Sequence, residues 1–111
     1  KGMLSDTYLV AKDMTLCLYA PSAVSYEWKI YLIQTTVVNE LYNLTDTTYK
    51  ELNIPGFIPL YSKQLNLYVP DVEDLLPTGT YKLVLKVTDG DGNEYTDSAA
   101  LVIYDPFYDI N

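Results

Sequence analysis

The chain has 111 residues, of which 49% are hydrophobic and 20% are charged, as in an ordinary globular domain. Its net charge of -8, with lysine as the only basic residue, argues against nucleic acid and anionic membrane surfaces as partners. Histidine is absent, which excludes Ser-His and Cys-His catalysis and zinc-histidine sites. We therefore expect one domain over residues 1–111, with no enzymatic activity and no required cofactor.

Cys17 is the single cysteine, so the expected fold has no internal disulfide and depends on packing. No apolar run is as long as a membrane span, which needs about 18 residues. The first residues also lack the charged and then apolar layout of a signal peptide. Because the chain begins with Lys1 rather than Met, we interpret it as one module of a longer multi-domain protein. Neighbouring domains of that parent chain are then its first expected partners.

Apolar residues repeat every second position, and turn residues interrupt them at short intervals, which predicts β-strands. The first two strands are expected over residues 5–12 and 14–20. In the second, Met14, Leu16 and Leu18 form the apolar face, and Cys17 points away from the core. The third, over residues 25–33, alternates most clearly and predicts a buried Trp28.

The middle of the chain is ambiguous. "TTVVNELYNL" fits either an edge strand or a short helix, and the prolines of "LNIPGFIPLY" fit an edge strand or a loop. Residues 63–70 alternate again and point Leu65, Leu67 and Val69 to one side. "DVEDLLPTG" predicts a single helical turn in which Asp71 caps and two leucines pack down.

The C-terminal part predicts a hairpin. After Gly79, Tyr81, Leu83, Leu85 and Val87 are expected to face inward. The joint "DGDGN" follows, and then a last strand over residues 94–104 has apolar residues at both parities, which leaves its inward face open. Seven or so short strands without helical crossovers predict an all-β, two-sheet antiparallel sandwich. A closed barrel is the alternative.

"SYEWKI", "PTGTYKLVLKVTDGDGN" and "DSAALVIYD" resemble the PKD-type and related bacterial or archaeal immunoglobulin-like modules. The resemblance covers the C-terminal third and the strand around Trp28, whereas residues 34–61 match no pattern. The "WDFGDG" stretch of strict PKD domains is replaced by "WKIYLI". The resemblance implies a tyrosine corner at Tyr81, with its hydroxyl bonded to backbone upstream, and an extracellular or cell-surface location.

The joint could be a calcium site or only a bend. As an EF-hand loop, it places Asp89, Asp91 and Asn93 correctly, but position 12 is Ala100 instead of a bidentate carboxylate. The glycines and the acidic side chains suit a tight turn, which is the favoured interpretation. A weak Ca2+ site using Asp89, Asp91 and Asp97 is the alternative.

Asp71, Glu73 and Asp74 form a second acidic cluster, which most often is a solvated loop. Paired carboxylates can cleave glycosidic bonds, but acidic pairs arise by chance in any acidic protein. The "NLT" pattern at Asn43 is a glycosylation acceptor that matters only in a secretory setting.

Tyrosine is the strongest compositional oddity, with 12 residues against two phenylalanines and one tryptophan. Tyr26 and Tyr81 are expected in the core, while Tyr19, Tyr31, Tyr68 and Tyr104 fall on outward faces. Outward tyrosines suit a protein interface or a sugar-binding surface, and they also pack as ordinary cross-strand pairs.

The sequence therefore favours a non-enzymatic, immunoglobulin-like module of an exported or cell-surface protein. It would serve as a spacer, an adhesion domain or an assembly domain. The alternative is a carbohydrate-binding module attached to a secreted enzyme, with a polysaccharide ligand. A third possibility is a subunit of a virion or surface filament.

Overall fold

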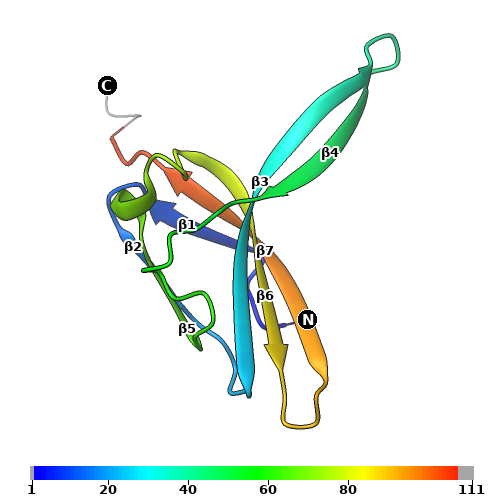
Figure 1. Ribbon diagram of the computed structural model, residues 1–111. Helices are drawn as coiled ribbons and strands as arrows, with labels where there is room; N and C mark the ends of the chain where they lie inside the picture. The colour runs from blue at the N-terminus through cyan, green and yellow to red at the C-terminus, as the bar shows by residue number, and fades with distance from the viewer. Residues whose placement is uncertain (1, 108–111) are drawn as a thin grey trace.

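The computed structural model describes residues 2–107, which form seven strands and one 3-10 helix (Figure 1). The elements in chain order are β1 (Thr7–Ala11), β2 (Thr15–Tyr19), β3 (Ser25–Asn39), β4 (Leu44–Glu51), β5 (Gln64–Tyr68), η1 (Val69–Val72), β6 (Gly79–Thr88) and β7 (Glu94–Tyr104). The predicted all-β class is confirmed. The last strand has the predicted bounds, whereas the third strand is six residues longer than predicted, because it ends at Asn39 and not at Ile33.

The strands make two sheets, one with five strands in the order β1-β7-β6-β3-β4 and one with β2 and β5. Neighbouring strands are antiparallel, except that β1 runs parallel to β7. In an immunoglobulin-type sandwich, β2 and β5 correspond to strands B and E, and β3, β6 and β7 correspond to C, F and G. The predicted two-sheet sandwich is confirmed, and its one departure from the prediction is the parallel β1-β7 pair.

The core lies between the two sheets and is built by the alternating residues of each strand. Trp28 is fully buried, and its indole N–H donates a hydrogen bond of 2.8 Å to the carbonyl of Ser62. The most buried side chains around it come from both sheets: Ile30, Leu65, Leu67, Leu83, Leu85 and Leu101. The predicted inward faces of β3, β5 and β6 are therefore correct, and the inward face of β7 is that of Ala99, Leu101 and Ile103.

The start of β6 carries the tyrosine corner that the resemblance implied. Tyr81 is 2% exposed, and its hydroxyl donates a hydrogen bond of 2.5 Å to the carbonyl of Pro77. Burial raises the pKa of the Tyr81 phenol, so the group remains a protonated donor. This bond ties the loop after η1 to the core.

Three expectations for single residues need correction. Met14 is 57% exposed, because β2 begins only at Thr15. Asp71 does not cap the short helix, which begins two residues earlier at Val69 with a proline in its first turn. Tyr26 is only half-buried at the rim of the core, where its hydroxyl bonds the backbone of Ala23.

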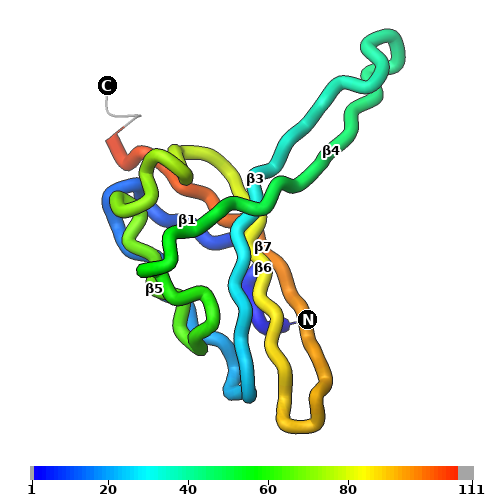
Figure 2. The backbone as a smooth tube through the Cα atoms, in the orientation of Figure 1, coloured from blue at the N-terminus to red at the C-terminus, as the bar shows by residue number. Residues whose placement is uncertain are grey.

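The long strand β3 has two different halves. Residues Ser25 to Leu32 pair with β6 inside the sandwich, and the second half pairs only with β4. Every residue from Gln34 to Glu51 is exposed. We call residues 34–51 the arm: a two-stranded ribbon that leaves the body of the sandwich, as the backbone trace shows (Figure 2).

The arm makes the molecule elongated. Its principal extents are 50 × 37 × 24 Å, and its radius of gyration is 15.9 Å. A compact domain of this length has a radius of gyration of about 13 Å. The ambiguous segment "TTVVNELYNL" is not a helix. Its residues 35–39 continue β3 with a neighbour on one side only, as the edge-strand alternative predicted, and they form part of a projecting hairpin.

The tyrosine corner generates a stability prediction. Tyr81→Phe removes the donor to Pro77 and should lower the free energy of unfolding by about 1 to 2 kcal/mol, because a partly buried carbonyl loses its partner. Tyr95→Phe is the matched control, since its hydroxyl makes only an exposed bond to Asp89. Urea unfolding measures both variants, and an equal effect of the two would contradict the corner's structural role.

Candidate binding surfaces

The joint between β6 and β7 is a hairpin turn held by Asp89. Its carboxylate accepts hydrogen bonds of 2.9 and 3.0 Å from the N–H groups of Asp91 and Asn93. Of the two glycines, only Gly92 adopts a positive φ, of 85°. The backbone bond from Asn93 is the main cause that lowers the pKa of Asp89. The carboxylate is thus already occupied by the turn itself.

Asp97 serves a different structural purpose. One of its carboxylate oxygens accepts hydrogen bonds of 2.9 Å from the N–H groups of both Met3 and Leu4, and so holds the N-terminal segment against β7. The bond from Leu4 is the main cause that lowers the pKa of Asp97. Asp89, Asp91 and Asp97 do not converge, and residues 2–107 contain no group of three acidic or cysteine side chains placed to hold a metal ion.

The second acidic cluster is solvated. Asp71, Glu73 and Asp74 are all exposed around the short helix. They belong to the same described region in which no metal-binding group is found. Cys17 is likewise exposed, on the outer side of β2, as its parity predicted.

The four outward tyrosines are split between two faces of the sandwich. Tyr19 and Tyr68 lie on the outer face of the small sheet, at opposite ends, because Tyr19 pairs with Gln64 and Tyr68 with Thr15. Tyr31 and Tyr104 lie on the large sheet. The sequence brings these rings to the surface, but the fold does not bring them together into one row.

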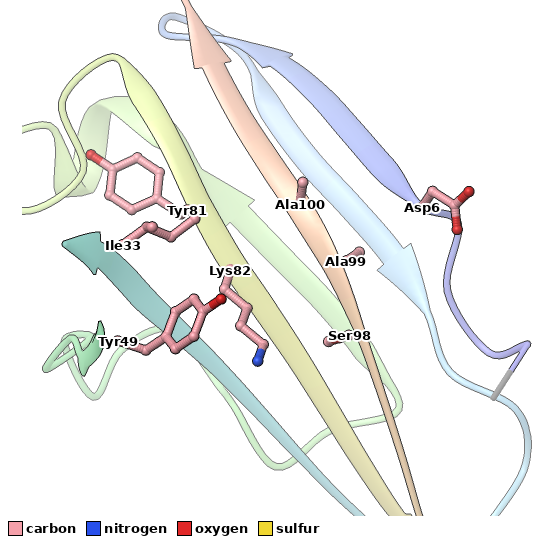
Figure 3. Close-up of a pocket in the computed structure, with 8 residues that line it drawn as sticks. All are labelled: Asp6, Ile33, Tyr49, Tyr81, Lys82, Ser98, Ala99 and Ala100. Carbon is pink, nitrogen blue, oxygen red and sulfur yellow. The ribbon is translucent and has the colours of Figure 1, made fainter. Parts of the chain in front are cut away.

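A shallow hollow of about 340 Å³ lies on the outer face of the large sheet (Figure 3). Tyr49 from β4 and Lys82 from β6 lie side by side there, with the Lys82 ammonium 4.4 Å from the centre of the Tyr49 ring. Ile33 and Ala100 complete its apolar part. The cation–π contact fastens the base of the arm to the sheet.

Apolar side chains gather along the arm and at its tip. The exposed fractions are 81% for Leu41 and 69% for Tyr42, which lie in the turn, and 60% for Val37 and 53% for Leu44, which flank it. Asn43 has a positive φ of 54°, a conformation that asparagine tolerates better than most residues. The sequence thus builds a defined turn and presents large apolar residues on it.

The direction of the hydrogen bonds in β4 follows from one contact. The N–H of Leu52 donates to the carbonyl of Ile30 at 2.9 Å, so even-numbered residues of β4 direct their N–H and C=O groups toward β3. Odd-numbered residues, from Thr45 to Glu51, direct theirs away from β3. β4 is the last strand of its sheet, so this second edge is open.

A second hollow, of about 280 Å³, lies next to the base of the arm. The loop that follows β4 lines it, with Leu52, Ile54, Ile58 and Leu60 as its apolar residues. Two exposed aromatic residues of the same loop, Phe57 and Tyr61, are 67% and 74% accessible. A hollow with several apolar lining residues thus lies at the opposite end of β4 from the apolar tip.

Two lysines on the large sheet of the body form ion pairs within the chain. Lys29 contacts Glu27 and Glu51, and Lys86 contacts Glu27 and Glu94, at 3.5 to 3.9 Å. Glu27 is also the main cause that raises the pKa of Lys29. Within the arm, Glu51 is thus paired with Lys29, whereas neither Asp46 nor Lys50 forms an ion pair with another residue in the described part of the chain.

Comparison with protein-family models, with curated proteins and with solved structures finds no match to this chain. Within residues 2–107, no helix has the length and hydrophobicity of a membrane span.

The arm is the feature that the sequence analysis missed. The signal was present in the run from Ile33 to Val38, where both parities carry β-branched or polar residues and neither is marked as a core face. A strand in which neither face is marked as buried is expected to extend beyond the core.

The bonding of Asp89 and Asp97 predicts that calcium does not stabilise the fold, because the N–H donors of the backbone already occupy these carboxylates. Thermal unfolding with and without Ca2+ measures this. Binding of Ca2+ to one site, at about 100 times its dissociation constant, would raise the free energy of unfolding by about 2.7 kcal/mol. A clear rise in melting temperature on addition of Ca2+ would therefore contradict the prediction.

Asp97 should also contribute to the pH dependence of stability. The pKa of Asp97 is lowered in the folded chain. Its contribution to the free energy of unfolding is therefore complete above the ordinary carboxyl pKa of about 4, and it is lost as the pH falls through the folded pKa. Asp97→Asn should flatten the loss of unfolding free energy on acidification. Asp91→Asn, whose carboxylate accepts no hydrogen bond within the described residues, is the control; equal acid slopes for both variants and the wild type would refute the assignment.

Proposed function

We propose that this chain is a non-enzymatic assembly or adhesion module of an exported or cell-surface protein, and that it binds other proteins through the arm. The arm is the observation that carries the proposal. Every residue from Gln34 to Glu51 is exposed, so this segment adds nothing to the core that holds the sandwich together.

The energetics of the arm support binding. A two-stranded ribbon without a hydrophobic face is only marginally stable in water, and an open strand edge is a template for other chains. Monomeric proteins shield such edges with prolines, lysines or short strands. Here the run from Ile33 to Val37 has no proline and no charged residue, so the outer edge of β3 in the arm is unshielded.

The composition of the arm supports the same proposal. Protein interfaces are enriched in tyrosine and depleted of charge at their centres. From Gln34 to Tyr49 the chain has only two charged residues, Glu40 and Asp46, although its net charge is -8. The arm thus offers contact area with little electrostatic cost.

The resemblance of "SYEWKI" and the β6–β7 hairpin to PKD-type and related modules supports an extracellular or cell-surface setting. A subunit of a virion or filament is a special case of the same proposal, since it too would assemble through the arm. A spacer that binds nothing would not need the arm.

Carbohydrate binding is the weaker proposal. A sugar ring stacks on an aromatic face, and a polysaccharide needs several such faces in line. Tyr19 and Tyr68 share a sheet face but lie four residues apart along it, about 13 Å, and Tyr31 and Tyr104 lie on the other side. The arm has no part in such a surface.

Site-specific photo-cross-linking tests the proposed function. A photoreactive amino acid at Leu41, in the tip, should give a cross-link to protein in the cells that make this chain. The control is the same group at Val24, which is 70% exposed but lies on the body. Cross-linking at both positions alike, or at neither, would overturn the proposal.

A shortened chain provides the second readout. Joining Gln34 to Thr48 by a two-residue Asn-Gly turn removes most of the arm and should leave the melting temperature of the body nearly unchanged, because the arm lies outside the core. Binding of the shortened chain to insoluble polysaccharide, if equal to that of the wild type and lost in Tyr68→Ala, would instead favour the carbohydrate proposal.

A further inference from the structure

We infer that the open edge of β4 binds the same edge of a second copy of this chain, antiparallel and centred on Thr48. This inference rests on the proposed function and names the partner. Two large sheets would thereby join into one continuous sheet through the two β4 strands. Three independent features of the arm support this occupant.

The first feature is the direction of the free backbone groups. Thr45, Thr47, Tyr49 and Glu51 direct their N–H and C=O groups to the open edge. In an antiparallel pair these groups meet only when an odd-numbered residue faces an odd-numbered residue. Centring on Thr48 satisfies this, because Thr47 faces Tyr49 of the second copy and Thr45 faces Glu51.

The second feature is charge. With Thr48 at the two-fold axis, Asp46 of each copy lies directly opposite Lys50 of the other. Both side chains are exposed and have no ion pair within the described part of their own chain. Asp46 and Lys50 face each other at a position where the two backbones exchange no hydrogen bond. Side chains at such positions lie closer together than those at hydrogen-bonded positions. Each interface therefore forms two cross-strand ion pairs.

Neighbouring registers lose this complementarity. Centring on Asp46 places two aspartates opposite each other, and centring on Lys50 does the same for two lysines. Centring on Thr47 or Tyr49 pairs the charges with neutral residues. Among the registers that the backbone allows, the one centred on Thr48 is selected by the sequence.

The third feature is the match between tip and hollow. The register centred on Thr48 places Leu44 opposite Leu52 of the second copy. If the same spacing continues beyond the end of β4, Leu41 and Tyr42 lie near residues 53–56 of the second copy. Asn53, Ile54 and Gly56 of this segment line the hollow of about 280 Å³. Two strongly exposed apolar residues of one copy thus approach a hollow beside the other copy's β4.

Charged residues on a strand edge can also have the opposite purpose, which is to prevent association. The two interpretations predict opposite effects. If Asp46 and Lys50 repel other chains, their replacement by serine should increase self-association; if they form intermolecular ion pairs, the replacement should weaken it.

Disulfide trapping tests the register. In a Cys17→Ser background, Thr48→Cys places one thiol of each copy at the axis, at the Cα separation of about 4.5 Å that suits a disulfide. We expect mild oxidation to give a covalent dimer. Thr35→Cys, an exposed threonine on the other strand of the arm, is the control and should stay monomeric. Equal trapping of both would contradict the register.

Charge exchange tests the ion pairs. Asp46→Lys and Lys50→Asp should each weaken self-association by about tenfold or more, because like charges then face each other across the axis. Mixing the two variants should restore association to near the wild-type level, because every facing pair is again opposite in sign. Sedimentation velocity measures all three samples, and a mixture that associates no better than its components would overturn the inference.

The two proposals fail in distinguishable ways. If the wild type stays monomeric at every concentration and Leu41 still cross-links to a different protein, the second copy is wrong and the proposed function stands. If Leu41 cross-links to nothing and the wild type is monomeric, both are wrong.

Discussion

The burial of Trp28 is the constraint on which the rest of the structure depends. Its side chain is fully enclosed between the two sheets, and its indole N–H is anchored to Ser62 on the loop that leads into β5. This fixes the position and direction of β3. Because β3 continues without a break to Asn39, the same contact that completes the core also aims the arm into solvent. The arm is therefore a direct continuation of the large sheet.

The two halves of β3 differ because β6 begins only at the tyrosine corner, opposite Leu32. Pairing stops at Leu32 and Tyr81, and the chain before Gly79 turns away to let Tyr81 reach Pro77. Beyond this point β3 has no neighbour on the side of β6 and pairs only with β4. The two-sheet sandwich thus produces, from ordinary packing rules, a body closed by its core and an appendage that is open on both edges.

The sequence predicted the body well because alternation is decisive where one face is buried. Trp28, Leu65 and Tyr81 each stand in a run whose other parity is polar. The sequence made no choice where both parities are alike: Ala100 and Val102 are as apolar as Ala99 and Leu101, so the inward face of β7 stayed open. The segment that forms the arm stayed ambiguous for the same reason, because neither parity marks a core face. Its binding surface could not be found because the sequence does not show which strand pairs with β4.

Amide hydrogen exchange in β4, resolved residue by residue, tests the central claim most directly. In dilute solution the account predicts slow exchange at even-numbered residues from Asp46 to Lys50 and fast exchange at the odd-numbered residues between Thr45 and Glu51. Concentrating the protein should slow the odd-numbered amides selectively. Rapid exchange along the whole of β4 at every concentration would contradict the account, because the arm would then be neither an ordered ribbon nor an edge that another chain covers.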